Sequence, residues 1–359
     1  MVDRAFFHNS DSTLGTSDVF SGSESLPATR CRQIYRLMVR GRTLEEQMVL
    51  MTQSGESYFW IGGPGEEAFN VALGLQVQKG CGPAFDYLHL HYRNSATLLA
   101  MGMPPIDGLR QAAMRRTDPH SMGRSFTSHF AKREWNVLPV SSVIGVQFAM
   151  ASGTAIMQKR SEGTGITIVT GGDAGTAEGD FASCLVWASR PANEVPVLMI
   201  VTNNQWGIST AADTQHGEKN IADRAKAFGI PSAVVDGNDP IASWHAIRQG
   251  MEYCRRRRRP YLLEAKVSRL HGHSSSSGAK RVSSEPDCLP LFEQKLLRDG
   301  ILSDAMVRNT RRQIVSDVER AVEQALQEPH PTPADRFRHT YAPSPVDVAY
   351  PSDFTGLPA

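Results

Sequence analysis

The sequence lacks the features of several protein classes. Its five cysteines are scattered, odd in number and never spaced as Cys-x-x-Cys, which excludes a disulfide framework and a Cys-x-x-Cys zinc site. No apolar run is long enough to span a bilayer. The net charge of +1 shows no excess of either sign, so nothing in the composition points to nucleic acid or a membrane surface. The cysteines are Cys31, Cys81, Cys184, Cys254 and Cys288.

The N-terminal segment has little of what a targeting signal requires. Residues 1–27 are rich in serine but also carry acidic residues, and no apolar core follows the start. Acidic residues are rare in organelle transit peptides, and a secretory signal needs an apolar core. We therefore expect residues 1–27 to be a mobile arm and the protein to be cytoplasmic.

One segment, residues 166–209, carries most of the structural information. Residues 166–170 are rich in β-branched side chains and flanked by glycine, which predicts a short buried strand. Residues 178–189 place apolar side chains at helical spacing, and residues 195–201 predict a second buried strand. A strand, a helix and a strand of this length form a right-handed parallel unit.

Two polar side chains follow these predicted strands. Asp173 comes after the first and Asn204 after the second, so both emerge at carboxyl ends of parallel strands, where open α/β sheets bind ligands. A carboxylate and an amide oxygen suit Mg²⁺, which takes few protein ligands and completes its shell with phosphate oxygens and water. Taken alone, Asp173 is equally consistent with a helix N-cap, and Asn204 with a turn.

The rest of the chain predicts an α/β fold with a mainly parallel sheet, helices on both faces, and helical N- and C-terminal extensions. Residues 28–52 have an apolar helical face, and residues 233–235 and 261–267 predict further strands. The expected domain spans residues 28–328. Prolines are frequent after it, so residues 329–359 are expected to be an extended, proline-rich tail.

Two further helices are marked by capping residues. Asp239 precedes Pro240, an N-cap followed by proline at the first helical position, and Ser303 precedes another segment with an apolar helical face. The run Arg255–Arg259 is basic enough to suggest nucleic acid. Because Pro260 follows it, we interpret the run as a solvated helix C-terminus.

Several motifs around these positions resemble those of a known family. Gly172-Asp173 followed by Asn203-Asn204 looks like the thiamine diphosphate motif. Flanking segments narrow the resemblance to the α subunit of the decarboxylating component of 2-oxo acid dehydrogenase complexes, over residues 30–330. These segments are Ala177-Glu178-Gly179-Asp180, Gly207-Ile208-Ser209-Thr210, residues 221–231, residues 235–239 and His271-Gly272-His273-Ser274.

The resemblance implies a thiamine diphosphate-binding fold and the cofactors thiamine diphosphate and Mg²⁺. It implies that Asp173, the Asn204 side chain and the backbone carbonyl of Trp206 ligate Mg²⁺. It also places His273 beside the reactive centre and Glu67 near the active-site channel, as candidate catalytic residues. The other cofactor-binding positions that it implies are Tyr92, Arg93, Ser142, Ile144, Gly172, Ala174, Gly175 and Ile208.

Elementary chemistry is consistent with these implied roles. The Arg93 guanidinium can hold phosphate oxygens in a bidentate manner, and a neutral His273 imidazole can donate to a phosphate or a developing alkoxide. Simpler roles stay open. Tyr92 and Arg93 are also consistent with a surface pair, and Glu67 with a carboxylate favoured by a helix dipole.

The implied reaction is the oxidative decarboxylation of a 2-oxo acid, with transfer of the acyl group to a lipoyl group on a separate acyltransferase. The cofactor carries the chemistry, and the protein supplies metal, orientation and electrostatics. In this family the glutamate that activates the cofactor lies on a β subunit. We therefore expect two α and two β chains, no appreciable turnover from this chain alone, and a β contact through the proline-rich tail.

Motif details bear on the substrate. Residues 178–180 and 208–210 are more similar to branched-chain members than to pyruvate members, so we expect a substrate such as 3-methyl-2-oxobutanoate. Pyruvate and acetoin dehydrogenases remain alternatives. A nucleotide-binding oxidoreductase is disfavoured, because no Gly-x-Gly-x-x-Gly follows a strand with an acidic residue at the expected distance.

Two departures from the family pattern motivate a third hypothesis. Relatives have glycine where this chain has Ala174, and a left-handed backbone there would cost alanine about 1–2 kcal/mol. Relatives also carry aspartates in the loop that here spans residues 274–281 and lacks them. A catalytically degenerate scaffold that regulates the β chain is therefore the alternative, and Ser274 matches a position phosphorylated in some relatives.

Overall fold

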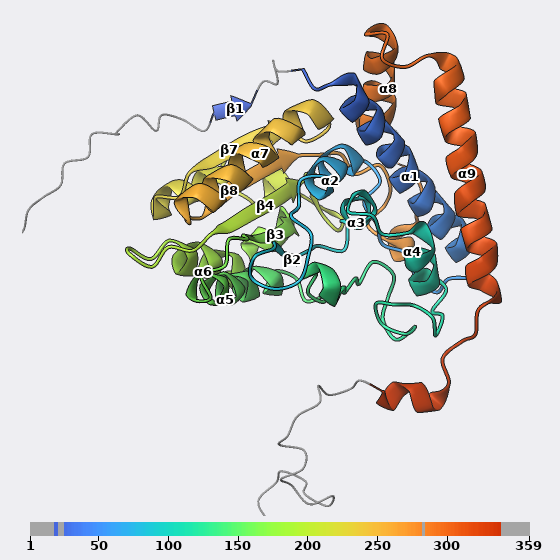
Figure 1. Cartoon of the computed structure of the whole chain (residues 1–359), viewed down its shortest axis with the longest axis horizontal. Coiled ribbons are helices and arrows are strands. Elements are labelled where there is room, and N and C mark those ends of the chain that lie inside the picture. Colours follow the sequence, from blue (N-terminus) through green and yellow to red (C-terminus); the bar gives the residue numbers. More distant parts are fainter. Residues whose placement is uncertain (1–17, 21–24, 282–283, 339–359) are drawn as a thin grey trace, which may run out of the picture.

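The computed structural model describes residues 18–20, 25–281 and 284–338, and within them a six-stranded sheet has the order β1-β7-β8-β4-β3-β2 (Figure 1). Every pair of neighbouring strands in it is parallel. The strands are β1 (Asp18–Phe20), β2 (Tyr87–His89), β3 (Thr167–Gly172), β4 (Val197–Asn203), β7 (Ser232–Asp236) and β8 (Tyr261–Lys266). A separate antiparallel pair joins β5 (Trp206–Gly207) to β6 (Thr210–Ala211).

The central strand β4 shows why the sheet is covered on both faces. All of its residues are buried, and alternate side chains point to opposite faces. Leu198 and Ile200 join the core beneath α2 (Glu67–Gly74) and α7 (Pro240–Arg257). Val197, Met199 and Val201 join the core beneath α5 (Val146–Arg160) and α6 (Gly179–Ala188). The predicted α/β fold, with helices on both faces, is confirmed.

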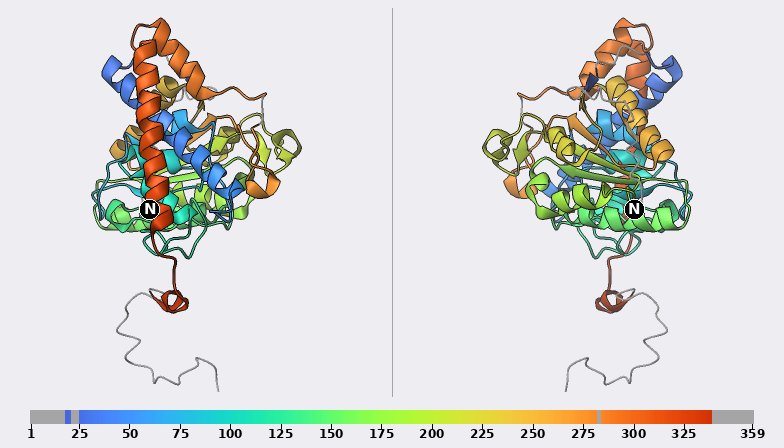
Figure 2. Two further views of the ribbon diagram at one scale, coloured as in Figure 1. Left: turned by 90° about the vertical axis from the view of Figure 1, so that its right-hand side faces the viewer. Right: turned by 90° about the vertical axis from the view of Figure 1, so that its left-hand side faces the viewer.

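A third core lies where the N-terminal helix α1 packs against the C-terminal helices α8 and α9 and against the short helices α3 and α4. The α1 side chains Ile34, Met38 and Leu44 are buried there with Ile314 and Val318 of α9. Figure 2 shows α9 running along α1 at one end of the molecule. The predicted helical extensions are therefore confirmed. The helices of this core are α1 (Ala28–Gln53), α3 (Ser95–Ala100), α4 (Pro105–Ala112), α8 (Cys288–Arg298) and α9 (Asp304–Gln327).

Both predicted helix caps are present. The Asp239 carboxylate accepts the backbone N–H groups of Ile241 at 2.8 Å and Ala242 at 3.3 Å, where α7 begins. The Ser303 hydroxyl accepts the N–H of Met306 at the start of α9. These side chains satisfy donors that have no partner within the helix.

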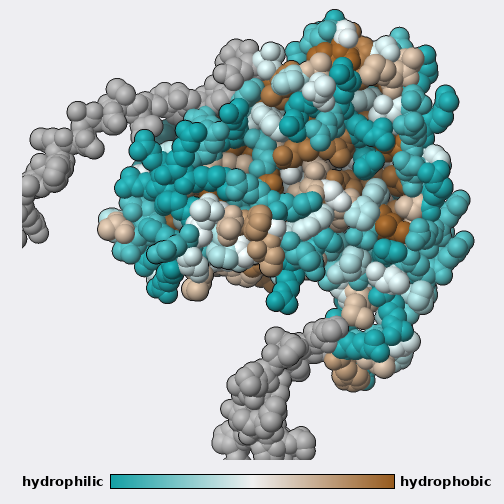
Figure 3. Space-filling view, in the orientation of Figure 1, coloured by the Kyte–Doolittle hydropathy of each residue, from teal (hydrophilic) through white to brown (hydrophobic). Residues whose placement is uncertain are grey.

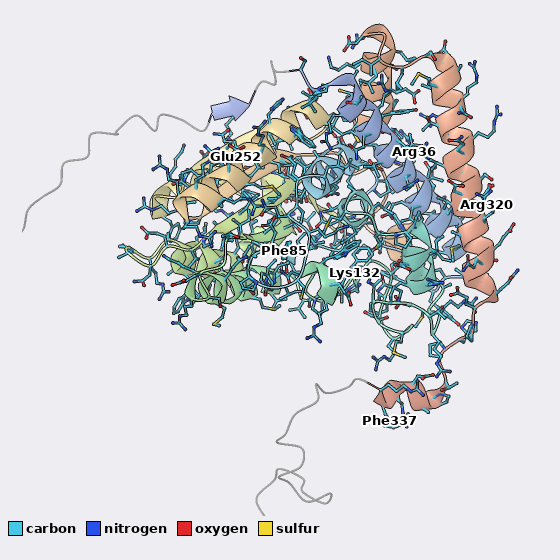
Figure 4. The ribbon with its side chains drawn as sticks, viewed as in Figure 1. Arg36, Phe85, Lys132, Glu252, Arg320 and Phe337 are labelled. Carbon is cyan, nitrogen blue, oxygen red and sulfur yellow. The ribbon has the colours of Figure 1, made fainter. Side chains whose placement is uncertain are left out.

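Short regular elements lie in both terminal segments. Within residues 1–27, β1 pairs in parallel with β7 and forms one edge of the sheet. Within the predicted extended tail, η6 (Pro333–Phe337) forms a 3₁₀ helix, which Thr332 caps reciprocally with Asp335. Figure 4 labels Phe337 on this helix. Residues 1–17, 21–24 and 339–359 lie outside the described part of the chain.

The surface is polar over α7 and the outer side of α9, and the apolar side chains of this view gather between them (Figure 3). In the described part of the chain, no helix is long and apolar enough to cross a membrane. The remaining described turns of 3₁₀ helix are η1 (Arg133–Trp135), η2 (Ala174–Ala177), η3 (Ala212–Thr214), η4 (Ile221–Phe228) and η5 (Ser275–Ser277).

Candidate active site

Asp173 and Asn204 lie together because their strands are neighbours. β3 and β4 pair in parallel, with Gly172 opposite Thr202, so the residues that follow emerge at the same edge of the sheet. The preceding residue, Asn203, has a different function, since its amide donates to the buried Glu264 carboxylate at 2.7 Å. Asn204 is thus the member of the asparagine pair that reaches the pocket.

A cavity of about 370 Å³ opens at this edge of the sheet. Its size is that of a small-molecule site. It brings together most of the residues predicted for the cofactor, which come from five separate parts of the chain. The predicted residues that line it are Tyr92, Arg93, Ile144, Gly172, Asp173, Ala174, Gly175, Asn204, Trp206, Ile208 and His273.

The oxygen atoms at the bottom of this cavity fit a magnesium site. Asp173 is only 1% exposed, and its Oδ2 atom has no hydrogen-bond partner. Burial raises the pKa of this carboxyl group, so a cation would stabilise the ionised form. No group of three or more His, Cys, Asp or Glu side chains suited to a metal occurs among the described residues. One carboxylate and one amide oxygen are typical of Mg²⁺ shared with phosphate.

Hydrogen bonds fix the orientation of the Asn204 amide. Its nitrogen donates to Glu66 Oε1 at 3.3 Å, and its oxygen accepts the backbone N–H of Trp206 at 3.2 Å. A carboxylate only accepts and a backbone N–H only donates, so the two bonds agree on which atom is the oxygen. The amide oxygen therefore lies on the side of Trp206, whose backbone carbonyl is the third predicted ligand.

Glu66 is a site residue that the sequence analysis missed. It is 1% exposed and its Oε2 atom has no partner. Burial raises its pKa to about 7, and Arg93, Asn204 and Thr202 act in the opposite direction. One signal was present in the sequence, since Glu66 stands beside the predicted Glu67. Periodicity in this short helix start does not distinguish which of the two contacts a cavity residue.

Arg93 lines the cavity and is held on several sides. Its guanidinium donates to the carbonyl of Gly62 and, at 3.1 Å, to Nδ1 of His273. Its Nε atom is 4.0 Å from Glu66 Oε1, and its guanidinium carbon lies 5.3 Å from the centre of the Tyr92 ring. Arg93 is buried, which is inconsistent with the alternative of a surface pair.

His273 is neutral at physiological pH in this environment. Burial, followed by the charges of Arg93 and Arg269, lowers its pKa to about 4. Because arginine donates to Nδ1, the single proton of the neutral ring lies on Nε2. Arg269 was not singled out in the sequence. It donates to the carbonyl of Ile208 at 2.8 Å and adds positive charge beside the pocket.

The turn at Ala174 carries no backbone strain. Ala174 opens the 3₁₀ helix η2 and is absent from the described residues with positive φ. The position therefore does not need glycine, and the penalty considered for a left-handed alanine does not arise. Glycine is required three residues earlier, at Gly171, where a Cβ atom would lie 2.5 Å from the Phe148 ring.

Two predicted residues do not line the cavity. The Ser142 hydroxyl bonds to Nε2 of His129, and its neighbour Ser141 lines the cavity instead. Glu67 turns toward α1, where Arg42 binds both of its oxygens at 2.6 and 3.0 Å. This ion pair explains the burial of Glu67 without a catalytic role.

The loop after His273 is anchored although it has no aspartates of its own. The backbone N–H of Ser275 donates to the Trp60 carbonyl at 2.8 Å, and the Ser275 hydroxyl accepts the Trp60 N–H at 3.1 Å. Arg281 reaches the Asp287 carboxylate at 2.6 Å. Ser274 is buried and caps η5, so a kinase would meet this hydroxyl only after the loop opened.

Comparisons with known proteins show which family and which proteins the chain resembles. The profile of the family described as dehydrogenase E1 component matches residues 35–334. The 2-oxoisovalerate dehydrogenase subunit alpha of Bacillus subtilis is 29% identical over 317 residues, which cover 86% of this chain and 94% of that protein. The 3-methyl-2-oxobutanoate dehydrogenase subunit alpha of Mycobacterium tuberculosis is 29% identical over 289 residues, 78% of this chain and 74% of that protein. The mitochondrial 2-oxoisovalerate dehydrogenase subunit alpha of Mus musculus is 26% identical, with 90% and 73% covered.

Proposed function

Because the chain belongs to the dehydrogenase E1 component family, we propose that it is the α subunit of an enzyme that oxidatively decarboxylates a branched-chain 2-oxo acid. The observation that carries this proposal is the meeting of Asp173, Asn204, Arg93 and His273 in one cavity. A metal ligand pair, a phosphate-binding cation and a neutral hydrogen-bond donor are what such a site requires.

Thiamine diphosphate is the cofactor that the family implies, and Mg²⁺ is proposed with it. When bound, the cofactor supplies the electron sink for the loss of carbon dioxide. Asp173, the Asn204 amide oxygen and the Trp206 carbonyl would hold the metal. Arg93 would neutralise the diphosphate, and burial strengthens that interaction because water competes less for the charges.

The proposed function of His273 is to donate a hydrogen bond from Nε2. Arg93 fixes the ring through Nδ1, which leaves the Nε2 proton free to meet an oxygen that gains negative charge. A pKa of about 4 keeps this proton bound to a neutral ring throughout the physiological range. Ile144 and Ile208 line the cavity and would exclude water from the acyl chain.

The acyl group is proposed to be branched. Relatives named for 2-oxoisovalerate and 3-methyl-2-oxobutanoate align over most of this chain, and apolar side chains flank the cavity. Pyruvate and acetoin are the competing substrates. The acyl group would then pass to a lipoyl group on a separate acyltransferase.

A β subunit is the proposed partner, in an assembly of two α and two β chains, and cytoplasmic location remains part of the proposal. Exposed apolar side chains on α5 and α6 support a partner beside the cavity, since such patches mark interfaces. They are Met150, Met157, Val186 and Trp187. The exposed Phe337 on η6 keeps the tail a candidate for a second contact.

The experiment that tests the function is co-expression with a β chain of the same family, followed by decarboxylation with an artificial electron acceptor. The substrates are 3-methyl-2-oxobutanoate and pyruvate, each with and without thiamine diphosphate and Mg²⁺. We expect cofactor-dependent turnover that favours 3-methyl-2-oxobutanoate, and Asp173→Ala should lower it at least about 100-fold because the metal loses its carboxylate.

Three other results would change the proposal. Preference for pyruvate would move the enzyme to that substrate class. A stable α–β complex that binds cofactor without turnover would favour the degenerate scaffold, and restoring the loop aspartates should then raise activity. A complex that binds neither thiamine diphosphate nor Mg²⁺ would overturn the proposal.

A further inference from the structure

We infer that Glu66 is a positioning residue of the cofactor site, which holds the Asn204 amide with its oxygen toward the metal and holds Arg93 toward the diphosphate. The inference rests on the proposed function and concerns this chain's own residues. Glu66 does not line the cavity, so it acts through the two side chains that do.

The first contact is with the metal ligand. The Asn204 amide nitrogen donates to Glu66 Oε1 at 3.3 Å. Without Glu66, the amide nitrogen would have no carboxylate to hold it in place, and the amide could rotate by half a turn. In the rotated form it would present its nitrogen, and not its oxygen, to a cation. An N–H group cannot ligate Mg²⁺, so the flip removes one of the proposed ligands.

The second contact is with the phosphate-binding cation. Arg93 Nε lies 4.0 Å from the same oxygen, Glu66 Oε1. The other two anchors of the guanidinium, the Gly62 carbonyl and His273, are uncharged partners. Glu66 is therefore the charged partner of this guanidinium, and it links the metal side of the site to its phosphate side.

The neighbouring residue makes the assignment testable. Glu67 is equally buried and follows directly in the chain, but its carboxylate binds Arg42 and contacts no side chain of the cavity. Glu67→Gln is therefore the matched control, a buried carboxylate lost at the same helix start without loss of a site contact.

The experiment measures the dissociation constant of Mg²⁺ in the α–β complex, by calorimetry at saturating thiamine diphosphate, together with thermal stability. We expect Glu66→Ala to weaken Mg²⁺ binding about 10–100-fold, the usual effect of removing a partner that orients a ligand. Glu66→Gln should lose less, because its amide oxygen still accepts from Asn204. Glu67→Gln should lower thermal stability. It should leave the dissociation constant of Mg²⁺ within about twofold of the parent value, because Glu67 shares no partner with the proposed metal ligands.

A double substitution separates positioning from general damage. If Glu66 acts on the metal through Asn204, Glu66→Ala should weaken Mg²⁺ binding far less in an Asn204→Ala background than in the parent. An unchanged constant in Glu66→Ala, or an equal loss in both backgrounds, would overturn the inference while the proposed function stands. Failure of the parent complex to bind Mg²⁺ with thiamine diphosphate would overturn both.

Discussion

At the scale of single residues, neighbours in the sequence have different surroundings. Asn203 bonds to Glu264 in the sheet while Asn204 reaches the cavity. Glu66 touches Asn204 while Glu67 binds Arg42. In each pair the residue type is the same, so the backbone direction at that point, and not the side-chain chemistry, decides which member belongs to the site.

His273 gives a pH prediction at this scale. Its pKa lies near 4 in the folded chain against 6.5 as the ordinary value, so the unfolded chain binds a proton between these values that the folded chain does not. The stability that neutral His273 allows is thus present above pH 6.5 and lost as the pH falls toward 4. We expect the free energy of unfolding, measured by urea titration, to fall less between pH 7 and pH 5 in His273→Asn than in the parent. Equal losses in the two proteins would show that the pKa is not lowered.

At the scale of elements, one arginine joins three helices. Arg42 of α1 binds Glu67 at the start of α2 and, at 3.0 Å, the carboxylate of Asp287, which caps α8. Arg281 shares the same carboxylate. The loop that carries His273 is thereby tied through Asp287 to the helices of the N-terminal core, which explains how it is anchored without aspartates of its own.

Removing this guanidinium should be costly. Arg42→Ala leaves the buried Glu67 carboxylate without its cation and Asp287 with Arg281 alone, and breaking a buried ion pair from one side costs about 3–5 kcal/mol. Urea unfolding measures the change. The control Arg36→Ala removes an exposed arginine from the same helix and should cost no more than about 0.5 kcal/mol. A loss below about 1 kcal/mol for Arg42→Ala would contradict a structural role for the pair.

At the scale of the whole molecule, the cavity lies beside an apolar face. α5 and α6 pack against each other through Phe148 and Phe181, whose ring centres are 5.0 Å apart. Their outer faces expose Met157, Val186 and Trp187. The first residues of α5 and the residue before α6 adjoin the cavity, so a chain docked along the full length of both helices would also reach the site.

A charge on this face should separate the subunits. Met157→Glu with Val186→Glu would place two carboxylates in the proposed interface. Burying these charges away from water without partners costs free energy of association. We expect the double variant to stay folded but to lose the β chain in size-exclusion chromatography, with at least a tenfold weaker association, or about 1.4 kcal/mol. Arg257→Glu, on α7 at the opposite face of the sheet, is the control. Unchanged assembly would place the β contact elsewhere.

Much of the fold could be predicted because it is written in local patterns. The β-branched runs of β3 and β4, the apolar face of α1 and the caps at Asp239 and Ser303 each depend on residues close together in the chain. Two short elements in the terminal segments were not predicted. β1 forms by pairing with β7, which is distant in the chain, and η6 forms where Thr332 and Asp335 cap reciprocally and Pro333 takes a first helical position.

The sequence by itself determined which elements form and that Asp173 and Asn204 end neighbouring strands, since strand periodicity and the strand–helix–strand handedness follow from short-range chemistry. Only the tertiary structure decided that Ser141 and not Ser142 lines the cavity, and that Glu66 and not Glu67 serves Asn204. Those choices depend on the direction of single side chains toward segments far away in the chain. No local pattern encodes that direction, because it is set only when the helices pack against the sheet.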